Sequence, residues 1–230
     1  MWHWSLISRF GETSLLLPCA LLLYLWLRHG GEPRAARLWL ACFTGAATVT
    51  LLSKLAFMGW GIGMRSLDFT GLSGHSMMAS ATLPVLLHRF APPQRAWLAA
   101  LCGLAAALLI GYSRLMLQVH SPSEVAGGLL TGMSASIAFL LLSARTPRRG
   151  APVPLSLAIA TLMLALPASG LHAPTHAWLE QFAMYLSGRD RPFRREDWPA
   201  RIARVEPASI AAHLPRHAAV IAGPPGVARR

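Results

Sequence analysis

The sequence has few charged residues, and acidic ones are scarcer than basic ones. Only 13% of its 230 residues are Asp, Glu, Lys or Arg, whereas a soluble globular domain carries about 25%. Hydrophobic residues make up 54% of the chain, and the mean hydropathy is +0.45. Because the charges are concentrated between long apolar runs, this composition argues against a soluble domain and indicates an integral membrane protein.

Cysteine is rare as well, and its three positions are Cys19, Cys42 and Cys102. Each lies inside an apolar run, and no pair has CxxC spacing, so we expect three small buried side chains. Two histidine pairs have the i,i+4 spacing of a metal clip, but no carboxylate or cysteine stands at a matching position. The pairs are His172 with His176 and His213 with His217. We therefore expect no metal site.

Basic residues outnumber acidic ones by 21 to 9, which gives a formal net charge of +12. A basic balance is also found in nucleic-acid-binding proteins. Here, however, the arginines lie in loops and a tail that flank apolar runs, so we expect them to orient the chain and attract anionic headgroups. The charge therefore predicts a membrane bilayer as partner and no nucleic acid.

Six apolar segments follow one another, and a bilayer core requires about 20 helical residues. They span residues 14–28, 36–58, 76–89, 96–112, 124–144 and 153–170. No small-residue cleavage site follows the first segment, so we expect a retained helix. The pattern predicts an all-α, polytopic membrane helical bundle with about six transmembrane helices. A five-span arrangement, with 153–170 re-entrant, is the alternative.

The segments predict a transmembrane domain over residues 1–170, with its core at 36–144, and a basic tail over 171–230. Within the tail, residues 174–187 are expected to form a short surface helix with its aromatic residues near one face. After Pro207 the tail is rich in Ala, Pro and Arg without periodicity, which predicts disorder.

Arginine distribution predicts the orientation of the spans. One set of connections holds eight arginines: Arg28, Arg34, Arg37, Arg89, Arg95, Arg145, Arg148 and Arg149. The other side holds Arg9, Lys54, Arg65 and Arg114. The positive-inside rule places the first set in the cytoplasm. The second set then faces the exterior, or the periplasm of a Gram-negative bacterium. The basic tail would also lie outside, but long tails obey this rule poorly.

Residues 111–124 carry the most informative polar pattern, because ionisable side chains at the ends of membrane segments indicate a functional site. Arg114 precedes His120 by six residues, and Glu124 follows four residues later. Ser121, Pro122 and Glu124 match a helix start with a capping box. Glu124 therefore has two interpretations: it caps the helix, or it accepts the Nδ1–H of His120 and leaves Nε2 free to attack.

A second histidine stands in Ser73-Gly74-His75, at the start of another apolar segment. Backbone N–H groups there would cradle phosphate oxygens, and His75 would protonate a leaving oxygen. Lys54 and Arg65 also have two interpretations. They are interfacial anchors, or they join Arg114 in neutralising a phosphate, with glycines 59, 61 and 63 letting their loop close over a headgroup.

These motifs together resemble the type 2 phosphatidic acid phosphatases, the PAP2 superfamily. The resemblance covers about residues 36–144, and the motif from Ser113 to Glu124 is the specific one. It implies a six-helix membrane fold and metal-independent catalysis without a cofactor. It implies His120 as nucleophile, His75 as general acid and Glu124 as orienting carboxylate. Phosphate would be held by Lys54, Arg65, Ser73, Gly74 and Arg114.

The sequence departs from the family pattern at three places. Ten residues lie between Lys54 and Arg65, where the family has six, and Ser66 replaces the usual proline. Leu72 stands where the family has the proline of Pro-Ser-Gly-His. Glu124 replaces the final aspartate and is one methylene longer. The first motif is therefore diverged, and Glu124 changes how His120 is held.

The resulting hypothesis is a lipid phosphatase that hydrolyses a phosphomonoester or pyrophosphate bond through a phosphohistidine. Its substrate would be a phospholipid or a polyprenyl (pyro)phosphate, and its site would face the outside of the cytoplasmic membrane. The alternative is a catalytically inactive membrane protein that binds or carries an anionic lipid with the same cations. The sequence names neither the lipid nor the oligomeric state.

Overall fold

The computed structural model describes residues 2–146, 150, 152–169 and 174–198. Those residues form helices and loops, and the sole β feature among them is an isolated bridge between Met64 and Phe69. The expected all-α class is confirmed. The α-helices are α1 (Trp2–Arg9), α2 (Thr13–His29), α3 (Pro33–Trp60), α4 (Gly74–Phe90), α5 (Ala96–Met116), α6 (Pro122–Ser143), α7 (Val153–Ser169) and α8 (Thr175–Ser187). Three short 3₁₀ helices are η1 (Arg65–Leu67), η2 (Pro93–Arg95) and η3 (Arg195–Asp197).

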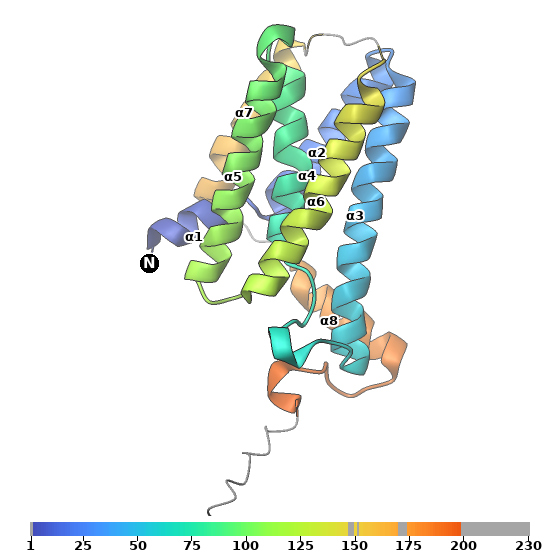
Figure 1. Ribbon diagram of the computed structural model, residues 1–230, viewed down its shortest axis with the longest axis vertical. Helices are drawn as coiled ribbons and strands as arrows, with labels where there is room; N and C mark the ends of the chain where they lie inside the picture. Colours follow the sequence, from blue (N-terminus) through green and yellow to red (C-terminus); the bar gives the residue numbers. More distant parts are fainter. Residues whose placement is uncertain (1, 147–149, 151, 170–173, 199–230) are drawn as a thin grey trace, which may run out of the picture. The chain divides into compact units, whose positions relative to one another are not determined.

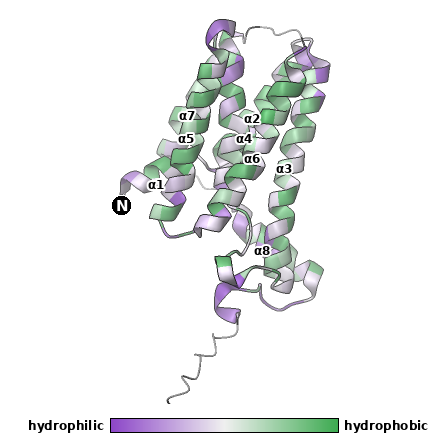
Figure 2. Ribbon diagram, viewed as in Figure 1, coloured by the Kyte–Doolittle hydropathy of each residue, from purple (hydrophilic) through white to green (hydrophobic). Residues whose placement is uncertain are grey.

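Each of the six apolar segments expected from the sequence is a helix, α2 to α7 (Figure 1). Among the described residues, four helical stretches are long and apolar enough to cross a membrane. They are Trp2–His29, Pro33–Trp60, Pro93–Met116 and Pro122–Ser143, and α7 is a shorter apolar helix. Figure 2 shows that hydrophobic residues dominate the middle of the bundle, whereas hydrophilic ones gather toward its ends. The chain is a multi-pass membrane protein.

Helix α4 lies at the centre of the bundle and packs against α2, α3, α5 and α6. Small residues permit this close packing. A Cβ atom at Gly103 would lie 2.6 Å from the carbonyl oxygen of Leu83, so α5 approaches the α4 backbone directly. On the α6 side, the Ser80 hydroxyl donates to the Leu129 carbonyl at 3.1 Å. Small-residue contacts and interhelical hydrogen bonds are typical of helix packing in membranes. They fix the start of α4 relative to α6.

A buried ion pair joins α4 to the start of α3. Arg89 donates to the carboxylate of Glu32, and both side chains are almost fully buried. The Arg89 guanidinium also lies 5.4 Å from the centroid of the Trp26 ring, which stacks on Phe90. A charge at this depth is stabilised by such partners. The pair therefore ties α2, α3 and α4 together at one end of the bundle.

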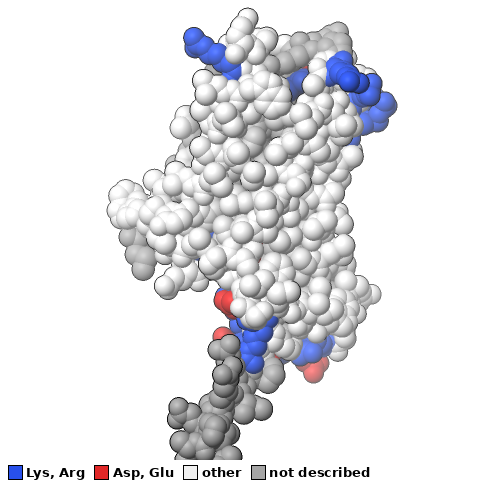
Figure 3. Space-filling view, viewed as in Figure 1, with Lys and Arg blue, Asp and Glu red and all other residues white. Residues whose placement is uncertain are grey.

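Basic residues are exposed around the same end of the bundle. Arg28, Arg34, Arg37, Arg95 and Arg145 are exposed, whereas Arg148 and Arg149 lie outside the described residues. Figure 3 shows Arg side chains, in blue, at the end that carries the α2–α3 and α4–α5 connections. The opposite end carries the starts of α4 and α6 and, beside the end of α3, helix α8 (Figure 1).

The surface helix expected over residues 174–187 is present as α8. Its Leu179 and Ala183 are buried beside Leu55 of α3, whereas Trp178 and Tyr185 are exposed. Residues up to Asp197 belong to one compact unit. A domain boundary at residue 170 stays a prediction, and the disorder expected after Pro207 falls outside the described residues.

Candidate active site

His120 and Glu124 form a hydrogen-bonded pair at the start of α6. The Nδ1–H of His120 donates to Oε2 of Glu124 at 2.7 Å. Ser121 is the N-cap residue, and a complete capping box joins its side chain and backbone to Glu124. The two interpretations of Glu124 are therefore compatible, because one carboxylate both caps the helix and holds the imidazole.

The Glu124 carboxylate is 1% exposed and accepts hydrogen bonds on both oxygens. Oε2 takes His120 and the backbone N–H of Ser121, the latter at 3.2 Å. Oε1 takes the N–H of Thr70 at 2.8 Å, the Thr70 hydroxyl at 2.5 Å and Nη2 of Arg195 at 2.7 Å. Each oxygen thus has its own set of donors, which fixes the plane of the carboxylate and the ring of His120 with it.

The start of α4 lies beside this pair. Ser73 is the N-cap residue, and its hydroxyl accepts from the Ser76 hydroxyl at 2.9 Å. The Ser73 N–H donates to the Glu124 carbonyl at 3.0 Å, which ties the starts of α4 and α6 together. Gly74 and His75 are the first residues of α4. The N–H groups at the start of a helix and the helix dipole favour anions.

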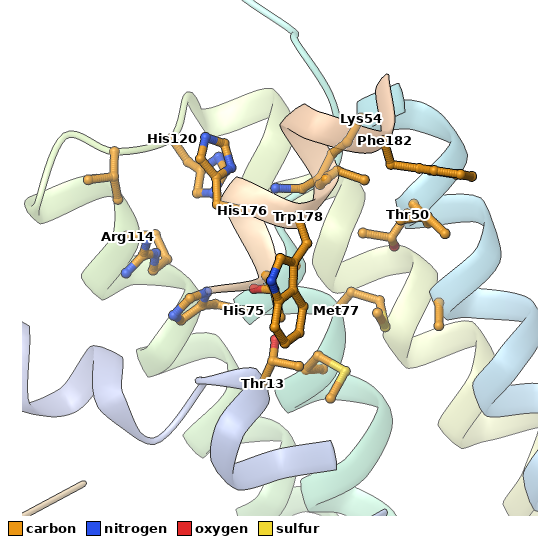
Figure 4. A pocket seen from close by; sticks show the side chains of 17 residues that line it. Thr13, Thr50, Lys54, His75, Met77, Arg114, His120, His176, Trp178 and Phe182 are labelled. Atoms are coloured by element: carbon orange, nitrogen blue, oxygen red, sulfur yellow. The ribbon is translucent and has the colours of Figure 1, made fainter. Parts of the chain in front are cut away.

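A cavity of about 780 Å³ brings together side chains that are far apart in the sequence. Lys54 from α3, His75 from α4, Arg114 from α5 and His120 all line it. Figure 4 shows His75, Arg114 and His120 on one side of the cavity and Thr50 on the other. All four of these side chains carry or can carry positive charge, so the cavity suits an anion.

Neighbouring residues hold these side chains in place. Lys54, the only lysine of the chain, packs against Gly71, whose φ of 139° favours glycine. A Cβ atom at Gly71 would lie 3.0 Å from Cγ of Lys54. Arg114 donates from Nη1 to the hydroxyl of Ser8, a buried residue of α1. The cations are thus supported by elements outside the four helices that present the site.

Arg65 is placed differently from the other expected phosphate ligands. It begins η1, is exposed and is not among the residues that line the cavity. Gly74 lines the cavity, whereas Ser73 is fully buried behind it as the N-cap of α4. A direct contact of Arg65 or Ser73 with phosphate therefore stays a prediction.

The expectation that glycines 59, 61 and 63 form a loop over a headgroup is wrong for the first two. Gly59 lies inside α3, where a Cβ atom would be 3.4 Å from Ser187 of α8. Gly61 is the C-cap of α3 with φ of 70°, and the Phe193 ring lies against it. These glycines instead make room for α8 and the segment that follows it.

Sequence reasoning missed three contributors to the site. Thr70 and Arg195 bind Glu124 from 54 and 71 residues away. Helix α8 supplies one wall of the cavity through Thr175, His176, Trp178, Leu179 and Phe182. A signal was available for α8 in its aromatic periodicity. No local pattern could reveal Arg195, because its partner is distant in the sequence.

Burial lowers the pKa of His120 below its ordinary value of 6.5. The hydrogen bond to Glu124 opposes this shift, and the positive charges of Lys54 and Arg114 reinforce it. A neutral imidazole that donates through Nδ1 has its lone pair on Nε2. The environment therefore favours the nucleophilic form of His120 at neutral pH.

Comparison with known proteins identifies the family. Residues 63–148 match the model of the PAP2 superfamily. A protein of Klebsiella pneumoniae, described as an uncharacterized 22.5 kDa protein in the cps region, is 40% identical over 204 residues. The alignment covers 85% of this chain and 97% of that protein. This chain belongs to the PAP2 superfamily. No solved structure matches it.

PAP2 proteins are typically phosphatases with membrane helices, so membership supports hydrolysis of phosphate esters at the level of the family. The matched segment contains His75, Arg114, His120 and Glu124 but begins after Lys54. The departures from the PAP2 pattern thus lie in the first motif, at the edge of the match, and within the match at Leu72 and Glu124.

Proposed function

We propose that this protein is a membrane-embedded phosphatase that cleaves a phosphomonoester or pyrophosphate bond of a lipid through a phosphohistidine intermediate. One observation carries the proposal. A single cavity joins His75, His120 and two cations to an apolar half, and His120 is oriented by a buried carboxylate. Such an arrangement fits an anionic headgroup at one end and hydrocarbon at the other.

The first chemical step uses His120 as the nucleophile. Its Nε2 attacks phosphorus, a nitrogen–phosphorus bond forms, and the bond to the leaving oxygen breaks. His75 gives a proton to that oxygen. Lys54, Arg114 and the first N–H groups of α4 stabilise the negative charge on the equatorial oxygens. Glu124 stabilises the imidazolium that develops on His120, because its carboxylate faces Nδ1–H.

The second step returns the protein to its starting state. His75, now neutral, takes a proton from water as the water oxygen attacks phosphorus. The nitrogen–phosphorus bond breaks, and inorganic phosphate leaves with His120 neutral again. Lys54 and Arg114 supply positive charge, so this scheme takes its electrostatic stabilisation from the chain's own cations.

The apolar half of the cavity supports a lipid as substrate. Leu51, Trp178 and Phe182 line the cavity and are also 44%, 62% and 47% exposed. Because these side chains lie on the outer surface of α3 and α8, an acyl or prenyl chain would pass between the cavity and the bilayer there. The substrate class is therefore a phospholipid or a polyprenyl (pyro)phosphate rather than a small sugar phosphate.

Charge distribution supports the side of the membrane on which the site lies. The exposed arginines of the α2–α3, α4–α5 and α6–α7 connections belong to the end opposite the starts of α4 and α6. The positive-inside rule assigns the arginine-rich end to the cytoplasm. We therefore place the site on the periplasmic or exterior face of the cytoplasmic membrane.

Phosphate release from a panel of lipid phosphates tests the function. The purified protein in detergent, with EDTA present, should release inorganic phosphate from at least one phospholipid or polyprenyl substrate. Brief reaction with substrate carrying a labelled phosphoryl group, followed by quenching in alkali, should leave label on His120, because phosphohistidine survives base. His120→Ala should remove both the label and the turnover.

A matched control distinguishes His120 and His75 from another histidine of the same cavity. His176 lines the cavity, and its Nε2 lies 3.4 Å from Oε1 of Glu180. His176→Ala should still form the labelled protein, whereas His75→Ala should lose turnover. Phosphate binding without release or labelling from any substrate would instead support an anionic-lipid carrier and end the phosphatase proposal.

A further inference from the structure

Arg195 reaches the site from a segment that follows α8. Its Nη2 donates to Oε1 of Glu124 at 2.7 Å, and its Nη1 donates to Oδ2 of Asp68 at 2.9 Å. The Arg195 side chain is 39% exposed, whereas the Glu124 side chain is 1% exposed. Arg195 therefore bridges the buried carboxylate and the loop before α4 from the outer side.

The segment 188–197, which we name the strap, is built to present Arg195. The Phe193 N–H donates to the Met58 carbonyl at 2.7 Å, and the Phe193 ring meets Phe57 edge-on at 5.4 Å. Gly61 leaves the room that this ring occupies. The strap is thus attached to the end of α3 by contacts that do not involve Arg195.

A second set of contacts closes the strap on itself. Arg191 donates to both carboxylate oxygens of Asp197, at 2.8 and 2.5 Å, and the Arg194 N–H donates to the same group at 2.8 Å. The Arg191 hydrogen bonds lower the pKa of Asp197 to about 2, so the pair stays charged over the working pH range. η3 is therefore held in shape beside Glu124.

The two oxygens of Glu124 are divided between the strap and the nucleophile. Oε1 faces Thr70 and Arg195, and Oε2 faces His120. The positive charge of Arg195 beside Oε1 makes the electrostatic potential at Oε2 less negative. The carboxylate then stabilises a protonated imidazole less strongly. The charged or titratable groups around His120 and its partner are Glu124, Lys54, Arg114, His75, His176, Asp68 and Arg195.

We propose that Arg195 is a positioning residue of the site: it fixes the Glu124 carboxylate so that Oε2 faces His120, and it keeps His120 neutral and nucleophilic. The inference rests on the proposed function for its catalytic consequence. It also explains the longer side chain at position 124. The extra methylene carries the carboxylate far enough to meet the helix cap, His120, Thr70 and the strap at once.

The test compares Arg195→Gln with Arg194→Gln in the full chain. Both remove one guanidinium from the strap, but Arg194 binds Asp197 through its backbone N–H, which the substitution keeps. Arg195→Gln should lower kcat at least about tenfold with KM within about threefold. It should also move the acid limb of the pH profile up by about one unit, because the lost cation makes protonated His120 more stable. Arg195→Lys should restore part of kcat and of the shift.

A spectroscopic readout separates this inference from the function itself. Histidine labelled with ¹⁵N in its ring reports the titration of His120, and the His120→Gln variant identifies its signal. The His120 midpoint should rise in Arg195→Gln and stay unchanged in Arg194→Gln. An unchanged midpoint, or an equal loss of kcat in both variants, overturns the role of Arg195. Absence of phosphate release by the unaltered protein overturns the proposed function and leaves the titration result standing.

Discussion

Glu124 is the residue at which capping and catalysis can be separated by mutation. Glu124→Gln keeps the shape of the side chain but places an NH₂ group opposite either His120 or the donors of Thr70 and Arg195. One charge-assisted hydrogen bond is lost, which is worth about 1.5–3 kcal/mol. If that stabilisation applies to the imidazolium of the transition state, kcat falls about 10- to 150-fold.

Glu124→Asp tests the reach of the side chain. The aspartate carboxylate would withdraw by about 1.5 Å, one carbon–carbon bond. From there it cannot bind His120 and Arg195 together in the present geometry. A misplacement of this size costs about 100-fold in rate. We therefore expect the aspartate of the wider family to be a poor substitute in this chain.

Ser121→Ala is the control, because it removes the other half of the capping box. It should destabilise the protein by about 1 kcal/mol in thermal unfolding. The His120–Glu124 hydrogen bond does not involve the Ser121 hydroxyl, so phosphate release should stay within about threefold of the unaltered rate. If Glu124→Gln loses stability like Ser121→Ala but keeps its rate, Glu124 only caps α6 and the orienting role is refuted.

Four further predictions concern the anion site and His120. Gly74 borders the cavity with open space where a Cβ atom would stand; Gly74→Ala should therefore keep its thermal stability but raise KM at least about fivefold, and an unchanged KM would place the phosphate elsewhere. Because burial lowers the pKa of His120, the acid limb of kcat/KM should fall below pH 6.5 in a scan from about pH 4.5 to 8.5; a limb above 6.5 contradicts this environment. In the unfolded chain His120 has its ordinary pKa, so it takes up a proton at a higher pH than in the folded protein. The free energy of unfolding should therefore also decrease as pH falls below 6.5. Lys54 is the only lysine, so its modification by an amine reagent can be followed on the Lys54 peptide by mass spectrometry. Inorganic phosphate should slow this modification but not that of the N-terminal amine, which is the internal control. If phosphate leaves the modification rate of Lys54 unchanged, phosphate does not bind beside Lys54.

Much of the fold follows from local signals in the sequence. The apolar runs set the helices, and polar residues with cap geometry set their starts. Ser121, Pro122 and Glu124 predict the first residue of α6, and Ser73 marks that of α4. Both signals act within four residues, so they need no knowledge of the partner helices. This locality is why the two helix starts that hold His75 and His120 could be identified in advance.

The surroundings of Glu124 could not be predicted in the same way. Thr70 and Arg195 lie in irregular segments without periodicity, and they meet Glu124 only after the bundle has formed. The prediction of a loop from the glycines after Lys54 was wrong for a related reason. Their pattern is typical of a mobile loop, but Gly59 and Gly61 are small because α8 and Phe193 pack on them. Which partner a small residue admits is decided by tertiary packing.

The central position of α4 has a consequence for how the protein is made. α4 is not among the helices of the described chain that are long and apolar enough to cross a membrane by themselves. It carries Ser76, Ser80 and Arg89 at buried positions, and such groups are costly in bare lipid. The partners that cover it on two sides, α5 and α6, are synthesised after it. Stable insertion of α4 therefore depends on α5 and α6, so we expect these three helices to enter the bilayer as a cooperative group and not helix by helix.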